Sequence, residues 1–203
     1  MSRYRGPRLR ITRRLGELPG LTRKSSAKQN PPGQHGSLPK KPSQYSIRLQ
    51  EKQKLRFHYG VSEHQLIGLV KKARRQVGST GERVLQLLEM RLDTIIFRSG
   101  FAPTLRASRQ LVNHGHIQVN ARSVNIPSYQ MKPGDTFEIK SNSVASSTLA
   151  SVIKENSQTI PQPAHIQSNN KECKGVVKNF ICREDVSCPV NEFLIIEYYS
   201  RKI

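Results

Sequence analysis

The stretch Thr104–Asn125, with the sequence TLRASRQLVNHGHIQVNARSVN, decides the fold because its hydrophobic pattern changes period halfway along. Its first half predicts a short helix, since the hydroxyl of Thr104 can cap the start and Gly115 can end it. Residues 116–120 and 123–126 then alternate polar and apolar side chains, which is typical of two strands joined by a tight turn.

The same unit extends beyond this stretch. Pro133-Gly134-Asp135 is a turn signal, and residues 136–140 predict a third strand. Two short helices followed by a small antiparallel sheet indicate an α+β module of about 60 residues. Residues 141–172 are rich in Ser, Asn and Gln without clear periodicity, so they predict a linker.

Helices are predicted before the module. Residues 44–59 form one, and a capping box that begins at Ser62 opens another, which runs to Val77. A second capping box, Ser79-Thr80-Gly81-Glu82, opens an amphipathic helix whose buried residues continue to Ile96.

The two ends of the chain differ in composition: the first is basic and rich in Pro and Gly, and the last contains an apolar run. Residues 1–42 hold repeated Pro and Gly residues that exclude long helices and strands, so an irregular basic arm is predicted, with a disordered tail as the alternative. Within the arm, Pro31–Gly36 suits a fixed turn that brings backbone N–H groups against phosphate. Near the other end, the apolar run Asn191–Tyr199 predicts one buried strand or an extended anchor, which must dock to avoid aggregation.

The charge of the chain indicates its partner. The 203 residues include 34 Lys and Arg against 14 Asp and Glu, a formal net charge of +20. Twenty of those basic residues, but five of the acidic ones, lie in residues 1–90. Such an excess opposes compaction unless a polyanion neutralises it, which favours nucleic acid over an anionic membrane surface.

Several classes of protein are excluded. No apolar run approaches the roughly 18–20 residues of a membrane span. The first residues lead into no apolar segment, so no secretory signal is expected, and Gly6-Pro7 and Pro19-Gly20 break any early helix, so no transit peptide is expected. The cysteines, Cys173, Cys182 and Cys188, are odd in number and lie late, which predicts a reducing compartment. Their spacing is not a zinc pattern.

A specific resemblance rests on four motifs. Arg91-Leu92-Asp93, Phe97–Ala102, Ala107–Asn120 and Pro133-Gly134-Asp135 resemble the S4-type RNA-binding domain. Several RNA-binding families share that module, so by itself it indicates RNA binding but does not identify the family.

The flanking sequences resemble one family, small ribosomal subunit protein four of the bacterial and plastid type. The similar stretches are Met1–Pro7, Pro32–Gly36, Glu51–Gly60 and Glu89–Asp93, with Leu18–Thr22 and Glu197–Arg201 resembling the plastid form.

This resemblance implies a structural ribosomal protein and no enzyme. Members bind 16S ribosomal RNA directly and early, at a junction of helices in its 5′ domain, and nucleate assembly of the subunit body. The resemblance further implies contact with small-subunit protein five, an influence on decoding accuracy, and a position near the channel through which messenger RNA enters. It places the protein in the small ribosomal subunit of the chloroplast stroma, and the expected absence of a transit peptide implies synthesis within the organelle.

The family fold implies α+β architecture, with a mainly helical N-terminal domain completed by the C-terminal tail and an S4-type module inserted between them. We divide the chain into a basic arm at 1–42, a helical domain at 43–90, the S4-type domain at 91–153, and a variable linker with a docking C-terminal strand at 154–203.

The candidate RNA-binding residues are basic or planar polar side chains of the arm, the Pro-Gly turn, the first long helix and the second helix of the S4-type module. They are Arg3, Arg5, Arg8, Arg10, Arg13, Arg14, Gln34, His35, Arg48, Lys52, Arg56, Arg106, Arg109, Asn113, His114 and His116. Lys and Arg would replace counterions on densely packed phosphates, and Arg adds bidentate contacts.

Two departures from the family pattern matter. Some bacterial relatives hold zinc with four cysteines near the N-terminus, but this chain has none before Cys173, so we expect no metal site and no cofactor. The tight turn reads Asn120-Ala121 where the family usually has Asn-Gly. Because Ala resists positive φ, we expect a changed turn type or local strain.

Three other functions fit the sequence less well. An RNA-modifying enzyme such as a pseudouridine synthase needs a separate catalytic domain, and no remaining segment is large enough for one. A DNA-compacting protein would bind duplex DNA as tightly as ribosomal RNA at equal salt. A membrane-surface role requires a broad apolar face opposite the cations, which the basic helices lack.

Overall fold

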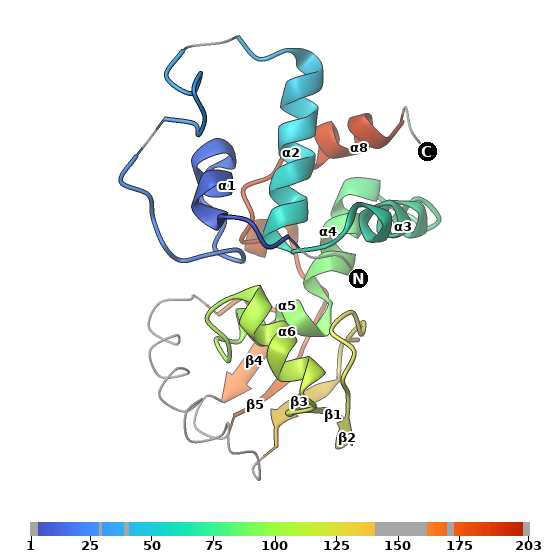
Figure 1. Ribbon diagram of the computed structural model, residues 1–203. Coiled ribbons are helices and arrows are strands. Elements are labelled where there is room, and N and C mark those ends of the chain that lie inside the picture. The colour runs from blue at the N-terminus through green and yellow to red at the C-terminus, as the bar shows by residue number, and fades with distance from the viewer. Residues whose placement is uncertain (1–3, 29, 39–40, 141–161, 170–172, 201–203) are drawn as a thin grey trace. The chain divides into compact units, whose positions relative to one another are not determined.

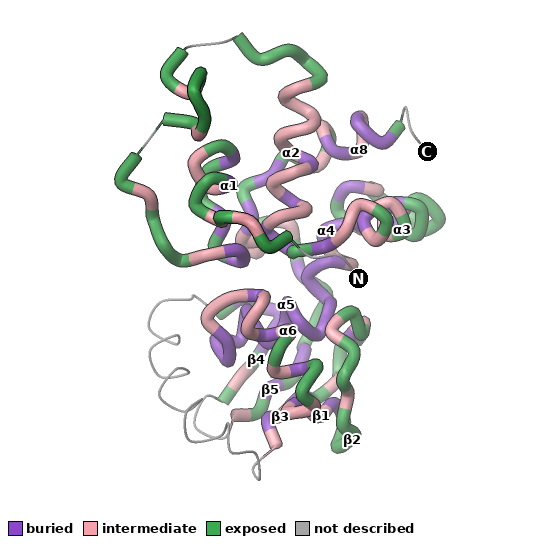
Figure 2. The backbone as a smooth tube through the Cα atoms, viewed as in Figure 1, coloured by how far each residue is buried: buried purple, intermediate pink, exposed green. Residues whose placement is uncertain are grey.

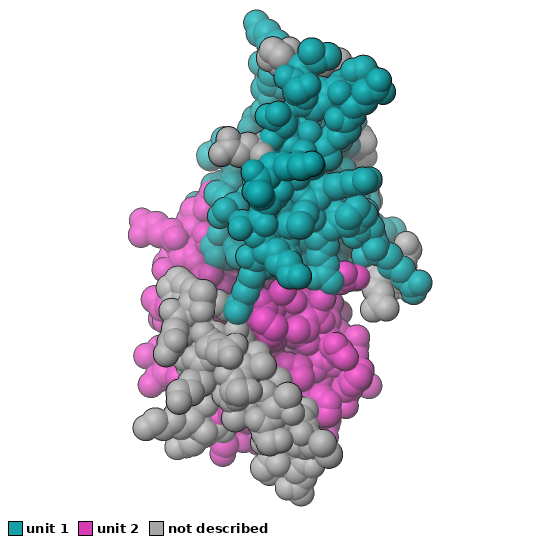
Figure 3. All heavy atoms as spheres, turned by 60° about the vertical axis from the view of Figure 1, so that its left-hand side comes forward, with its two compact units in different colours: residues 1–84, 187–203 teal, residues 85–186 magenta. Residues whose placement is uncertain are grey.

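The computed structural model describes residues 4–28, 30–38, 41–140, 162–169 and 173–200 (Figure 1). The chain forms two compact units, coloured separately in Figure 3. Unit 1 comprises residues 1–84 and 187–203, and unit 2 comprises residues 85–186. The four-segment division made from the motifs remains a prediction, because it groups residues by sequence pattern and not by contact.

Unit 1 is helical in its described residues. Its elements are α1 (Arg8–Leu15), α2 (Gln44–His58), α3 (Glu63–Arg74), the start of α4 (Thr80–Glu89), and α8 (Glu192–Ser200). The last helix packs against α2 and α3, so segments from the two ends of the sequence lie side by side. This arrangement confirms a helical domain completed by the C-terminal tail.

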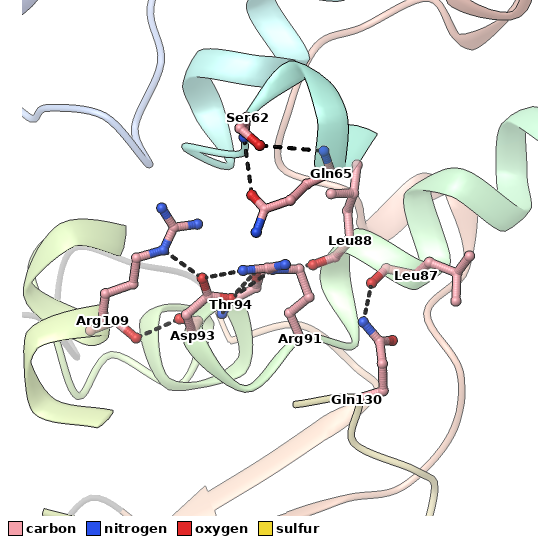
Figure 4. A network of polar contacts seen from close by, with 10 residues as sticks. Ser62, Gln65, Leu87, Leu88, Arg91, Asp93, Thr94, Arg109 and Gln130 are labelled. Atoms are coloured by element: carbon pink, nitrogen blue, oxygen red, sulfur yellow. Dashed lines mark hydrogen bonds and ion pairs between the residues drawn. The ribbon is translucent and has the colours of Figure 1, made fainter. Parts of the chain in front are cut away.

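Local capping explains where α2 and α3 begin. The hydroxyl of Ser43 accepts a hydrogen bond from the backbone N–H of Ser46 at the start of α2. At the start of α3, Ser62 Oγ accepts from the Gln65 N–H while the Gln65 side chain accepts from the Ser62 N–H (Figure 4). The predicted capping box at Ser62 is therefore confirmed.

The basic arm contains a helix that the sequence interpretation missed. Pro7 precedes α1, and Gly16, with φ +91°, ends it. The prolines and glycines thus bound a short helix instead of excluding regular structure. Its apolar residues pack in a small cluster with the neighbouring loop and α2, made of Ile11, Leu15, Leu18, Leu21 and Phe57.

The predicted C-terminal strand is wrong, because residues 192–200 form helix α8. Ile195, Tyr198 and Tyr199 are buried at helical spacing, while Phe193 stays 74% exposed. A short, continuous apolar run does not distinguish a buried strand from a buried helix, so its partners decide.

The predicted continuous helix from residue 80 to residue 96 is also wrong. It is broken into α4 and α5 (Leu92–Arg98), with Arg91 extended between them at φ −74° and ψ 142°. The break lets residues 127–131 pair with this backbone, through Met131 N–H to Met90 O and Leu92 N–H to Tyr129 O. A tertiary contact therefore overrides the helical periodicity.

Unit 2 contains a five-stranded antiparallel sheet in the order β2-β1-β3-β5-β4. Its strands are β1 (Ile117–Val119), β2 (Arg122–Ser123), β3 (Thr136–Ile139), β4 (Ile166–Asn169) and β5 (Lys174–Val177), and its helices include α5, α6 (Leu105–Asn113) and the 3₁₀ turn η1 (Arg183–Asp185). Residues of α5, α6 and the sheet share one apolar core (Figure 2). The predicted cap is confirmed, since Thr104 Oγ1 accepts from the Ala107 N–H.

Two strands lie where a linker was expected. β5 pairs with β3, and β4 pairs with β5. Gly175 lies opposite Phe137, and a Cβ at this glycine would stand 2.3 Å from Phe137 Cζ. The aromatic ring therefore fills the space of the absent side chain. The part of the predicted linker at 141–161 lies outside the described residues.

The hairpin between β1 and β2 keeps its turn type despite the alanine. Asn120 and Ala121 have φ values of +49° and +63°, the left-handed pair of a type I′ turn. The side-chain amide of Asn120 donates to Asp135, and its oxygen accepts from the Thr136 N–H. Holding alanine in this region costs about 1–2 kcal/mol, so the strain alternative is the one realised.

Tyr199 should anchor α8. Its hydroxyl donates to Glu63 Oε1 at 2.9 Å, and burial together with this carboxylate raises the pKa of Tyr199. We expect Tyr199→Phe to lower the free energy of unfolding by about 1–3 kcal/mol in urea titrations, because a buried bond to a charged group is lost. Phe193→Leu, at an exposed position on the same helix, is the control; equal losses in both variants would contradict the anchoring role.

His165 should make unit 2 sensitive to acid. The side chain is 2% exposed, and within the described ranges neither ring nitrogen has a hydrogen-bond partner. Burial, and then the Arg98 guanidinium, lower the pKa of His165 from 6.5 to about 4, although Asp185 opposes them. As pH falls from 6.5 toward 4, the unfolded chain binds a proton that the folded chain excludes, so stability decreases.

The measurement is urea unfolding at pH 7 and pH 4.5 for the native chain and for His165→Phe. The native chain should lose up to about 3 kcal/mol more than the variant over this interval. His114→Gln, at an exposed histidine, should behave like the native chain. A stability difference between native and His165→Phe proteins that is the same at both pH values would refute the assignment.

Candidate nucleic-acid interface

The arginines of α1 divide into two groups. Arg8 Nη1 donates to Leu21 O at 3.4 Å, and Arg13 Nε donates to Asn30 O at 2.9 Å, so both hold the loop that follows the helix. Arg10 and Arg14 are exposed on the same helix, as is Arg5 before it. Arg3 lies outside the described residues.

The predicted turn at residues 31–36 is formed. The Gly36 N–H donates to Gly33 O at 3.2 Å, and Gly33 has φ +110°. A Cβ at Gly36 would stand 1.9 Å from Pro31 O, so the turn needs glycine there. Gln34 and His35 are both exposed on it, where a ligand can reach them.

The predicted basic stripe of α2 meets carboxylates and rings of its own unit. Arg48 pairs with Glu197 at 2.5 Å, and Lys52 pairs with Glu63 at 3.0 Å. Lys52 is 4% exposed and also lies over the Tyr198 ring at 4.7 Å.

Two further features bind this stripe into the unit. Arg56 lies over the ring of Phe57 at 5.1 Å. Burial alone would raise the pKa of Glu63, but the hydrogen bonds from Lys52 and Tyr199 outweigh it and lower that pKa. As the spacing predicts, these cations lie on one face of α2. Carboxylates and aromatic rings of the same unit contact them there.

In unit 2, a fully buried carboxylate holds two arginines (Figure 4). Asp93 accepts from Arg91 Nε and Nη2 at 3.0 and 2.8 Å, and from Arg109 Nε at 2.7 Å. The Thr94 N–H is a further donor at 3.0 Å. Arg109 remains 26% exposed, so its guanidinium is fixed by Asp93 at the surface of α6.

The other predicted residues of this region lie along α6 or just after it. Asn113 and His114 are exposed, and Arg106 and His116 are partly exposed. The rings of His114 and His116 lie 5.9 Å apart. With Arg109, they present planar and cationic groups that can bind phosphate or stack on bases.

The sequence interpretation left one cationic group out of the candidate site. Lys71, Lys72, Arg74 and Arg75 are all exposed at the end of α3. Their crowding within five residues of the sequence was the available signal.

The described part of the chain offers no grouping of three or more His, Cys, Asp or Glu side chains that could hold a metal ion. Its three cysteines are separate thiols, with Cys188 buried and Cys182 exposed. Across the described ranges, no helix has the length and apolar character needed to cross a membrane.

Two family models match the chain. One, described as the ribosomal protein S4/S9 N-terminal domain, matches residues 3–89, and the other, described as the S4 domain, matches residues 90–137. The small ribosomal subunit protein uS4c of Nephroselmis olivacea is 55% identical over 203 residues, which is 100% of both chains. The uS4 protein of Thermosynechococcus vestitus is 56% identical over 203 residues, again covering 100% of both.

These matches confirm the family that the motifs predicted. Both predicted parts, the N-terminal domain and the S4 module, are found in the expected order. The similarity also includes the residues after position 140, because the relatives align over the full length. The chain therefore belongs to the uS4 family of small ribosomal subunit proteins, which are structural, RNA-binding constituents of the ribosome and not enzymes.

Proposed function

We propose that this chain binds 16S ribosomal RNA directly and early, and that it nucleates assembly of the body of the small subunit. In the finished subunit it contacts small-subunit protein five, lies near the channel through which messenger RNA enters, and contributes to translational accuracy. It works in the chloroplast stroma, where it is also made. Support for the chloroplast comes from the uS4c relative of Nephroselmis olivacea.

The observation that carries the proposal is the division of cations into two sets. One set, which includes Arg48, Lys52 and Arg91, is paired with carboxylates inside its own unit. The other, which includes Arg10 and Arg14, is exposed on a helix with no acidic residue in its first turn. An excess of exposed cations favours binding to a folded RNA, because each cation can displace a counterion from a phosphate.

The test is a filter-binding competition on the full chain. A transcript of the 5′ domain of 16S ribosomal RNA is compared with duplex DNA of the same length at equal salt. Preferential binding of the transcript supports the proposal, and equal binding would favour the DNA-compacting alternative. Co-sedimentation with small subunits after a high-salt wash tests whether the chain is a stable constituent.

Exposed and paired arginines should affect RNA binding differently. Arg10→Gln and Arg14→Gln should each reduce the slope of log affinity against log salt by about 1, because each removes one phosphate contact. Arg48→Gln carries the same change of charge but loses the pair with Glu197. It should leave the slope unchanged and lower the unfolding midpoint; a slope change as large as that of Arg14→Gln would contradict the division.

Asp93 should be needed for the stability of unit 2. Asp93→Asn leaves the buried Arg91 without a counter-charge, so we expect a loss of about 3–5 kcal/mol in the free energy of unfolding. A stable Asp93→Asn protein would show that the network is dispensable.

Replacing both Arg106 and Arg109 with Glu should weaken RNA binding, and the change at Arg109 also places a second carboxylate against Asp93. Gln110→Ala, a change at an exposed position of the same helix outside the candidate site, is the control.

A further inference from the structure

Helix α3 presents one continuous face to solvent, opposite its buried residues (Figure 2). We call this the outer face of α3, and its exposed members are His64, Gly68, Lys71, Lys72 and Arg75. At 100° per residue, all of them project within about 60° of the direction of Gly68. Leu66, Val70 and Ala73 form the buried side.

The cations of the outer face are not paired with any acidic side chain in the described part of the chain. Among the residues that the structure describes, no carboxylate pairs with Lys71, Lys72 or Arg75. The C-terminal end of a helix favours cations, but Lys71 and Arg75 are four residues apart, a spacing at which like charges repel. The protein alone gains little from placing three cations together here.

Gly68 is a second and independent observation. It lies in the interior of α3, where glycine is less favourable than alanine. A Cβ at this position would meet nothing within 4 Å, and its φ is not in the left-handed region. Neither the backbone conformation nor packing against the residues that the structure describes therefore requires glycine here, unlike Gly175, where a Cβ would overlap Phe137.

We propose that the outer face of α3 is a docking surface for the sugar-phosphate backbone of RNA. The absent side chain at Gly68 lets the RNA backbone approach the helix closely. Lys71, Lys72 and Arg75, about one or two turns further along, then bind consecutive phosphates. The inference rests on the proposed binding of ribosomal RNA and assigns a contact apart from α1 and α6.

RNA suits this face better than a protein partner does. The centres of protein interfaces are depleted in Lys and rich in apolar and aromatic side chains. The outer face has neither feature, since its five members are two lysines, an arginine, a histidine and a glycine. Phosphates, by contrast, need dense cations and a backbone that can be approached.

The experiment measures two properties that should move in opposite directions. Gly68→Ala should raise the thermal midpoint of the full chain, because alanine favours the helix. It should also weaken binding to the 5′ domain transcript by about threefold, and the bulkier Gly68→Gln should weaken it by about tenfold or more. A purely structural role for Gly68 could not produce tighter folding together with weaker binding.

The charges are tested separately. Lys71→Gln, Lys72→Gln and Arg75→Gln should each lower the salt slope by about 1. Arg74→Gln is the matched control, because Arg74 is exposed on the same helix but projects about 120° from Gly68. Its effect on the slope should be smaller than that of Arg75→Gln.

The outcomes separate the two proposals. If the native chain fails to bind the transcript, the proposed function itself fails. If the native chain binds and the Gly68 variants bind equally well, RNA docking on α3 is overturned. Normal transcript binding by Gly68→Gln, combined with failure to enter small subunits, would assign the face to a protein partner and equally overturn the RNA proposal.

Discussion

Carboxylates are scarce in this chain, with 14 acidic against 34 basic side chains, and their placement constrains the structure. Asp93 is fully buried between two arginines of unit 2, while Glu63 joins α2, α3 and α8 through Lys52 and Tyr199. Glu197 ties α8 to α2. Because these three carboxylates lie where elements meet, they leave unneutralised cations on the exposed surfaces of α1 and α3. A folded polyanion is the natural complement of such a surface.

The sequence predicted those features of the fold that depend on interactions between residues close together in the chain. The caps at Ser62 and Thr104 and the β1–β2 turn depend on residues within a few positions of each other, so they were readable. The helix break at Arg91 and the added strands β4 and β5 depend on pairing with distant segments. Residues 166–177 show no period-two alternation, so the two strands that extend the sheet beyond β3 could not be predicted. The apolar pattern of residues 192–200 is compatible with either a docked helix or a buried strand.

The candidate site was predictable as a set of residue types but not as a surface. Spacing placed Arg48, Lys52 and Arg56 on one side of α2, yet only the fold shows that α8 and α3 cover that side. Likewise, the sequence indicated Arg109 as an RNA ligand without revealing that Asp93 holds its Nε. On α3 the cations can be read from the sequence. The open space around Gly68 is known only from the structure.

The discontinuity of unit 1 has a consequence for biosynthesis. Residues 85–186 form a contiguous unit that can complete its contacts once they have left the ribosome, whereas residues 1–84 must wait for residues 187–203. Until α8 has been translated, Lys52 and Arg48 lack Tyr198 and Glu197, and the nascent helices α2 and α3 display additional uncovered cations. While it is tethered within reach of ribosomal RNA, the growing polypeptide therefore exposes cations that Glu197 and Tyr198 contact in the folded unit.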